Sequence, residues 1–304
     1  MQEIVPDTEH RGLVGALPPT LRDLALLARF DRPIGWWLLF WPGAWGVLLA
    51  GAARLQGLQV LELLGWLLLG AVAMRGAGCV YNDIVDADID RQVARTAQRP
   101  VASGRVRRRT AWLWLLALCL IGLVVLLQLR WQAQLVALAS LAAVAAYPFM
   151  KRITWWPQAW LGLVFSWAAL VGWVEIRGDM LGVLALLYGG SIAWVIGYDT
   201  IYALQDREDD ALVGVRSSAL RMGARVRGGV TAFYGVALAC WAAAFWVLRP
   251  DWLALLSLLP MALHLTWQVA TLQPDDGEGA LRRFRSNRLA GLLMALACWV
   301  VGNA

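Results

Sequence analysis

The 304-residue chain is poor in charged residues, in histidine and in cysteine. Only 16% of its residues are charged and 60% are hydrophobic, and the mean hydropathy of +0.58 is too high for a soluble domain of this length. The chain has two histidines, and its four cysteines (Cys79, Cys119, Cys240 and Cys298) stand far apart, each in an apolar segment. This spacing gives neither a zinc site nor a disulfide framework, so we interpret the cysteines as small core residues.

Long apolar runs and tryptophans make up much of the rest. Nineteen tryptophans fit a protein with two membrane interfaces, where indole rings anchor. Residues 1–33 read as a tail without a signal-peptide pattern, followed by a short interfacial amphipathic helix. Nine runs of bilayer-spanning length follow: 34–53, 58–80, 111–129, 132–149, 157–175, 180–198, 229–248, 252–272 and 286–303. The sequence therefore predicts an all-α polytopic membrane protein with one transmembrane domain, 34–304.

The distribution of arginine predicts the orientation. Four connections on one side of the membrane carry a single basic residue each, namely Arg54, Arg130, Arg177 and Arg249, and most of the 27 basic residues lie on the other side. By the positive-inside rule, the basic side is cytoplasmic. This bias accounts for the net charge of +6 without a nucleic-acid partner. We expect a protein of the bacterial inner (plasma) membrane whose site opens to the cytoplasm, and no obligate protein partner.

Two acidic stripes stand at the cytoplasmic ends of the second and sixth expected helices. Asn82, Asp86 and Asp90 recur every four residues, so on a helix they share one face, where like charges repel. The second stripe repeats the spacing further along the chain, with Asp199, Tyr202, Asp206 and Asp210. We expect the helices to enclose a central cavity in which the two stripes face each other.

Carboxylate pairs with oxygen donors alone suit a hard divalent cation. Mg²⁺ takes one or two carboxylates and completes its shell with water and substrate phosphates. Arginines follow both stripes, and their guanidinium forks bind phosphate oxygens: Arg91, Arg95, Arg99 and Arg105 after the first, and Arg207 and Arg216 after the second. Together these residues predict a diphosphate site, and its place at the edge of a membrane core predicts a lipid tail on the diphosphate ester.

These residues resemble the signatures of the membrane-bound, UbiA-type aromatic prenyltransferases. The first pattern is Asn82-Asp83-x-x-Asp86-x-x-x-Asp90-x-x-x-x-Arg95-Thr96-x-x-Arg99-Pro100. The second is Tyr198-Asp199-x-x-Tyr202-Ala203-x-x-Asp206-x-x-x-Asp210. Shorter matches are Arg29-Phe30-Asp31-Arg32-Pro33 and Tyr147-Pro148-Phe149-x-Lys151-Arg152. The resemblance runs from about residue 21 to the end, and the second signature is most similar to members that prenylate 4-hydroxybenzoate in ubiquinone biosynthesis.

The resemblance implies a Mg²⁺-dependent transfer of a polyprenyl group from polyprenyl diphosphate to the carbon of 4-hydroxybenzoate ortho to its hydroxyl. The implied Mg²⁺ ligands are Asn82, Asp86, Asp90, Asp206 and Asp210, with Asp83 beside them as a further candidate. The implied substrate-binding residues are Arg95 and Arg99, the weaker candidates Arg32 and Lys151, and Tyr147 and Tyr202, for which packing is an equal alternative. Asp199 is the candidate to accept a hydrogen bond from the phenol or the ring proton.

Two alternatives stay open at this stage. Within the family, the acceptor could be haem, a naphthoate or homogentisate. Outside it, intramembrane acids also occur in ion-coupled transporters, which place their sites near the bilayer midplane in broken helices. The clustering of these acids at helix ends on one side of the membrane counts against transport.

Overall fold

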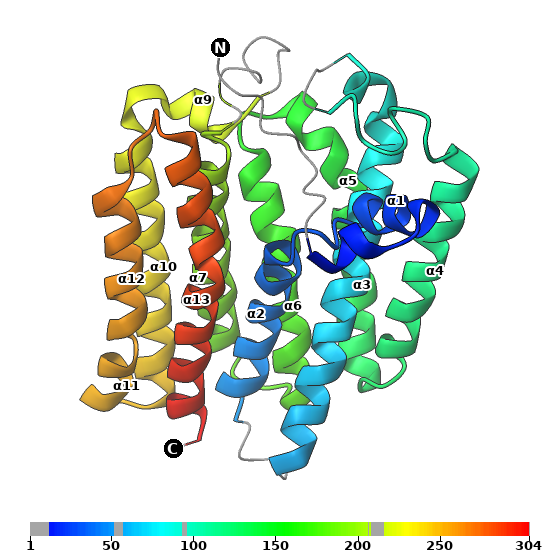
Figure 1. Ribbon diagram of the computed structural model, residues 1–304. Coiled ribbons are helices and arrows are strands. Elements are labelled where there is room, and N and C mark those ends of the chain that lie inside the picture. The colour runs from blue at the N-terminus through cyan, green and yellow to red at the C-terminus, as the bar shows by residue number, and fades with distance from the viewer. Residues whose placement is uncertain (1–11, 52–56, 93–95, 206, 208–215, 304) are drawn as a thin grey trace. The chain divides into compact units, whose positions relative to one another are not determined.

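A computed structural model of the chain describes residues 12–51, 57–92, 96–205, 207 and 216–303. Over these ranges the regular structure is entirely helical, as Figure 1 shows. The helices pack into two compact units. Unit 1 combines the chain up to Trp36 with Leu68–Gln128, and unit 2 combines Trp37–Leu67 with the chain from Leu129 onward. The predicted all-α architecture is thus confirmed for the described part of the chain.

The described regular structure of both units consists of helices. Unit 1 contains η1 (Gly12–Ala16), α1 (Pro19–Leu27), most of α3 (Gly57–Asp90) and α4 (Arg108–Leu126). Unit 2 contains most of α2 (Ile34–Leu49), the start of α3, α5 (Trp131–Ile153), α6 (Pro157–Ile176), α7 (Leu181–Tyr202), α9 (Ser218–Met222), η3 (Gly223–Arg225), α10 (Val226–Leu248), α11 (Trp252–Ser257), α12 (Leu259–Thr271) and α13 (Gly277–Gly302).

Apolar length matches the expected membrane spans. Within the described ranges, eight helical segments are long and apolar enough to cross a bilayer, and α2, with 16 residues, is a shorter apolar helix. Each of the nine predicted spans corresponds to one of these segments. On α4, the leucines at 113, 116 and 120 expose 68%, 53% and 52% of their surface, as expected of side chains that face lipid.

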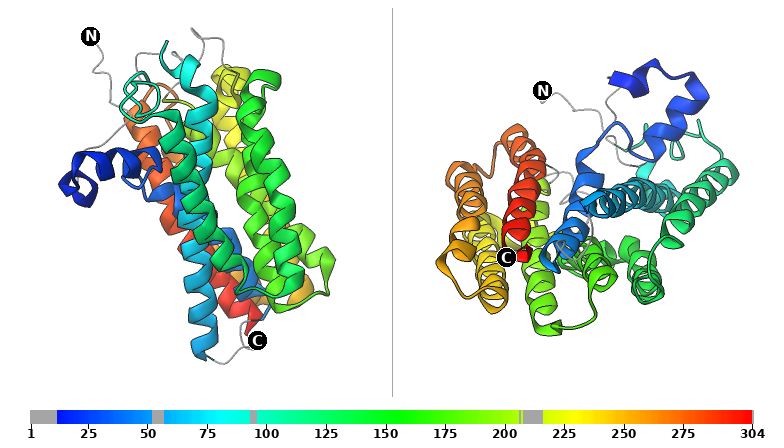
Figure 2. Two further views of the ribbon diagram at one scale, coloured as in Figure 1. Left: turned by 90° about the vertical axis from the view of Figure 1, so that its right-hand side faces the viewer. Right: turned by 90° about the horizontal axis from the view of Figure 1, so that it is seen from below.

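Several helices extend beyond their predicted ends. α3 runs on to Asp90 and does not end at residue 80, so the whole first stripe is part of the spanning helix. Figure 2 shows this helix, in blue to cyan, as one continuous ribbon. α13 begins at Gly277 and not at 286. The Asp276 carboxylate accepts a hydrogen bond from the Gly279 N–H at 2.8 Å and so caps the start of this helix. The apolar pattern marks where the bilayer core stops, whereas intrahelical hydrogen bonds continue into the interface.

Small residues allow the helices of unit 2 to approach closely. A Cβ added to Gly46 on α2 would lie 2.4 Å from the Ala169 carbonyl oxygen on α6, and one added to Gly172 on α6 would lie 2.2 Å from the carbonyl oxygen of Gly43. α7 packs against α6, α10 and α13 in the same unit. Four of the nineteen tryptophans are fully buried and so are core residues of this unit, not interfacial ones: Trp45, Trp173, Trp194 and Trp241.

Gly172→Ala is expected to destabilise the protein by about 1–3 kcal/mol, because the new methyl group meets backbone that cannot move aside. Thermal unfolding in detergent measures this as a lower Tm. The matched control is Gly189→Ala on α7, where a Cβ meets no atom within 4 Å and the better helix former should hold or raise the Tm. An equal Tm for the two variants would contradict this account of the α2–α6 contact.

Candidate active site

The first acidic stripe occupies the last turns of α3, in unit 1. Asn82, Asp86 and Asp90 are one helical turn apart, and their side chains share one face as predicted. Asp86 is fully buried and Asp90 is 5% exposed, whereas Asn82 is half-buried. Buried carboxylates are stable as anions only beside cations or hydrogen-bond donors, so the partners of these residues define the site.

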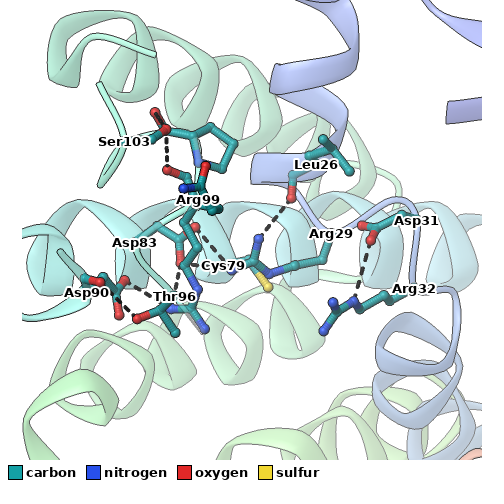
Figure 3. Close-up of polar contacts among 12 residues, drawn as sticks. Leu26, Arg29, Asp31, Arg32, Cys79, Asp83, Asp90, Thr96, Arg99 and Ser103 are labelled. Carbon is teal, nitrogen blue, oxygen red and sulfur yellow. Dashed lines mark hydrogen bonds and ion pairs between the residues drawn. The ribbon is translucent and has the colours of Figure 1, made fainter. Parts of the chain in front are cut away.

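Asp83 lies next to the stripe and contacts two arginines from distant parts of the chain. The Arg29 Nη2 atom is 3.2 Å from each Asp83 carboxylate oxygen, and the Arg99 Nη1 atom is 3.3 Å from its Oδ1. The Asp83 side chain is only 2% exposed, and those of Arg29 and Arg99 are 11% and 15% exposed. Asp83 is therefore the centre of a buried ion-pair cluster (Figure 3).

Arg99 also contacts the stripe itself. Its Nη1 atom lies 3.0 Å from Asp90 Oδ2, so one guanidinium nitrogen touches two carboxylates (Figure 3). The Thr96 hydroxyl donates to the Asp90 carbonyl oxygen at 3.0 Å. This hydrogen bond joins the segment that carries Arg99 to the end of α3. Val101 and Val106 are buried in a hydrophobic cluster with Leu27 and other residues of unit 1. The backbone that carries Arg99 is thus packed against helices.

Arg29 adopts a backbone conformation that arginine rarely takes. Its φ is +58°, and it follows the last residues of α1 in a Schellman motif, with Phe30 N–H donating to Ala25 O and Arg29 N–H to Leu26 O. Glycine usually holds this position, because a β-carbon there costs about 1–2 kcal/mol. Sequence reasoning missed Arg29 as a site residue, although a missing glycine at a helix end was a usable signal.

Further ion pairs lie in unit 1 outside this cluster. Arg32 Nε lies 3.4 Å from Asp31 Oδ2, next to α1 in sequence. Asp88 is exposed, as expected for a residue off the stripe face, and pairs with Arg91 at 3.2 Å and Arg108 at 2.7 Å. The two exposed pairs of Asp88 join the two ends of the connection between α3 and α4 and contribute at most about 1 kcal/mol each.

In unit 2, the start of the second stripe lies on the last turns of α7. Asp199 is half-buried. The Tyr202 ring lies 4.6 Å from the Phe284 ring on α13, and the Tyr198 ring lies 5.8 Å from the same ring. Thr200 and Ser218 hydroxyls are 2.6 Å apart, which joins α7 to α9. Asp199 therefore stands on a helix end with an aromatic wall beside it.

Several other predicted site residues lie partly or wholly outside the described residues. Asp206, Asp210 and Arg95 lie outside the described residues, as does the side chain of Lys151, whose backbone belongs to α5. Tyr147 is half-buried on α5. α7 ends at Tyr202 and a turn follows, and because Asp206 lies outside the described residues, the spacing of the second stripe beyond Tyr202 stays a prediction.

Arg216, which sequence reasoning placed among possible phosphate ligands, binds protein groups. Its Nη1 atom donates to the Ile153 carbonyl oxygen at 2.8 Å, and its guanidinium lies 5.5 Å from the centre of the Trp155 ring. Arg216 thus satisfies an open carbonyl at the end of α5.

The donor chemistry of the first stripe fits Mg²⁺. Its donors are carboxylate and amide oxygens, which this ion prefers, and two of the carboxylates are buried. Among the described residues no group of three or more His, Cys, Asp or Glu side chains is placed to hold a metal. Mg²⁺ needs fewer protein carboxylates than that, since water and substrate phosphates supply its remaining ligands.

Comparison with known proteins gives consistent matches. The model of the UbiA prenyltransferase family matches residues 39–297. The chain is 39% identical to the "4-hydroxybenzoate polyprenyltransferase, mitochondrial" of Caenorhabditis elegans, over 93% of this chain and 79% of that protein. It is 40% identical to the protein of the same name from Drosophila melanogaster, over 97% and 74%.

Solved structures match in fold. The apo structure of a UbiA homologue from Aeropyrum pernix has a TM-score of 0.70 and 26% identity, covering 87% of this chain and 97% of that one. A UbiA homologue from Archaeoglobus fulgidus bound to GPP and Mg²⁺ has a TM-score of 0.68 and 16% identity, covering 93% and 100%. The helical fold of the chain is therefore one that has been seen by experiment.

Proposed function

Because the chain belongs to the UbiA prenyltransferase family, we propose that it transfers a polyprenyl group from polyprenyl diphosphate to 4-hydroxybenzoate, at the carbon ortho to the hydroxyl, in ubiquinone biosynthesis. The observation that carries this proposal is the 39–40% identity, over more than nine-tenths of the chain, to proteins named 4-hydroxybenzoate polyprenyltransferase. The buried carboxylates and arginines at the end of α3 supply the chemistry that such a transfer needs.

The first part of the proposed mechanism is the departure of diphosphate. Asn82, Asp86 and Asp90, with Asp206 and Asp210, would hold Mg²⁺, which when bound neutralises charge on the leaving diphosphate. Arg99 stands beside Asp90 and would donate to the diphosphate oxygens. Arg95, Lys151 and Arg32 are further cationic candidates for the same oxygens.

The second part is attack by the phenol ring. Ionisation of the allylic C–O bond leaves a carbocation that must be kept from water. The rings of Tyr198 and Tyr202 both pack against that of Phe284, and the half-buried Tyr202 would be the one to present a π face to the cation. Asp199, on the same helix as the two tyrosines, would accept the phenol hydrogen bond or the ring proton. Loss of that proton restores aromaticity. Tyr147 is a further candidate to line the substrate site.

Transport is disfavoured by the shape of the helices that carry the acids. Transporter sites use broken helices near the bilayer midplane. Here α3 is unbroken from Gly57 to Asp90, and α7 is unbroken from Leu181 to Tyr202. Their acidic residues lie at the ends of these helices. An enzyme acting on a diphosphate at the membrane surface fits this arrangement better.

The protein is integral to a membrane. The matched relatives are named as mitochondrial proteins, which gives no support to the bacterial inner membrane expected from the sequence. We propose only that the site opens on the membrane side that carries the arginine-rich connections.

Detergent-purified protein incubated with Mg²⁺, 4-hydroxybenzoate and geranyl diphosphate is expected to form a prenylated benzoate, and EDTA is expected to stop it. Liquid chromatography with mass spectrometry measures the product. The control is the same protein with EDTA followed by excess Mg²⁺, which should restore turnover. Absence of any EDTA-sensitive prenylated product, with other phenolic acceptors also inert, would contradict the proposed function.

A further inference from the structure

The contacts of Asp83 differ from those expected of a metal ligand. Its two carboxylate oxygens receive three guanidinium contacts of 3.2–3.3 Å, from Arg29 and Arg99. We infer that Asp83 is a positioning residue, which anchors Arg29 and Arg99 so that the Arg99 guanidinium stands at the diphosphate end of the stripe. This inference deepens the proposed function and rests on it.

Helical spacing explains how Asp83 can hold Arg99 beside the metal face. Asp83 and Asp90 are seven residues apart, which returns the side chain to nearly the same side of the helix after two turns. One nitrogen of Arg99 touches both carboxylates. If Asp90 turns to a cation, its contact with Arg99 is lost but the contact with Asp83 remains. Arg99 is then kept close to the stripe with donors available for a phosphate oxygen.

The backbone conformation of Arg29 also favours a positioning role for Asp83. The chain keeps an arginine at φ +58°, where glycine would be unstrained, and the guanidinium of this arginine reaches a carboxylate 54 positions away. A strained residue held by surrounding contacts is typical of functional sites. With Arg29 on one side, the charge of Asp83 is balanced whether or not Arg99 also contacts Asp90.

The charges of the cluster agree with this division of roles. Arg29 and Arg99 bring two positive charges to Asp83, whose side chain is 2% exposed. A cation placed on Asp83 would sit beside two guanidinium groups and be repelled by both. Asp86 lies on the neighbouring face of α3, is fully buried and remains the better ligand candidate.

The test compares Asp83→Asn with Asp86→Asn in the purified full-length protein. The first readout is the affinity for Mn²⁺ alone, measured by electron paramagnetic resonance of the free ion. The second is the KM for geranyl diphosphate at saturating 4-hydroxybenzoate, separated from kcat. For Asp83→Asn we expect Mn²⁺ affinity within about threefold of the parent, and a KM raised at least about tenfold because Arg99 is no longer held. In Asp83→Glu, which keeps the negative charge, the KM for geranyl diphosphate should lie between those of the parent and Asp83→Asn.

Arg29→Gly has a matched control in Met180→Gly. Met180 is the other described non-glycine residue with positive φ, at +54°, and precedes α7 at the end of that helix opposite to Asp199. Both changes relieve backbone strain, but only Arg29→Gly removes a guanidinium from Asp83. We expect a higher KM for geranyl diphosphate in Arg29→Gly and an unchanged KM in Met180→Gly.

Two results would overturn the inference. One is a loss of Mn²⁺ affinity in Asp83→Asn as large as that in Asp86→Asn, which would make Asp83 a ligand. The other is a fall in kcat with no change in KM, which would make its role merely structural. The rise of Tm on adding geranyl diphosphate and Mg²⁺ without acceptor reports diphosphate binding separately, so a parent protein inactive on 4-hydroxybenzoate still tests the inference.

Discussion

Asp86→Asn is expected to lower kcat roughly 10²–10³-fold while the protein still inserts and folds. Asp86 is fully buried on the face of α3 shared with Asn82 and Asp90. Asparagine keeps the size of the side chain but carries no charge to draw Mg²⁺ to the site. Steady-state turnover at saturating substrates measures the effect, and the elution volume and Tm in detergent check folding.

Asp88→Asn is the matched control for this prediction. Asp88 lies two residues further along the same helix, but its side chain is 71% exposed and its partners Arg91 and Arg108 are themselves about half exposed. We expect turnover within about twofold of the parent, since exposed ion pairs contribute little.

Asp206→Ala should match the loss seen in Asp86→Asn if the two stripes serve one diphosphate. Near-normal turnover in both Asp86→Asn and Asp206→Ala would contradict the metal assignment.

Arg99→Gln is expected to move two measurements in opposite directions. The kcat/KM for geranyl diphosphate should fall about 10²-fold, because a guanidinium that binds phosphate oxygens is lost. The affinity for Mn²⁺ should rise several-fold, because Asp90 no longer has a guanidinium nitrogen 3.0 Å away and its negative charge becomes available to the ion.

Arg108→Gln serves as the control for Arg99→Gln. Arg108 pairs with the exposed Asp88 at 2.7 Å and its side chain is 51% exposed. Neither measurement should change by more than about twofold in this variant. If Arg99→Gln lowered the affinity for Mn²⁺ together with activity, Arg99 would be supporting the shape of the stripe and not competing with a cation at Asp90.

Much of the fold follows from the sequence because a bilayer imposes a length. Each predicted span corresponds to an apolar helix, since a run of that length has few other stable forms in lipid. The helix ends were predicted less well, as α3 and α13 show, because polar turns beyond the bilayer core leave no apolar signal. Trp45 and Trp194 are buried against each other, with ring centres 5.0 Å apart, and composition alone does not separate such residues from an interfacial belt.

Part of the candidate site could likewise be predicted from the sequence, and part could not. Four-residue spacing was enough to place Asn82, Asp86 and Asp90 on one helical face, because that depends on local geometry alone. The pairing of Asp83 with Arg29 depends on where α1 ends relative to α3, which no local pattern contains. The same holds for Arg216, whose partner at Ile153 belongs to another helix.

The most direct test of the account offers several acceptors to the enzyme at once. Purified protein, Mg²⁺ and geranyl diphosphate are mixed with equal concentrations of 4-hydroxybenzoate, homogentisate and a hydroxynaphthoate, and the products are identified by mass spectrometry and nuclear magnetic resonance. We expect 3-geranyl-4-hydroxybenzoate to be the main product and EDTA to abolish its formation. Prenylation of another acceptor in preference to 4-hydroxybenzoate, or transfer that continues in EDTA, would contradict it.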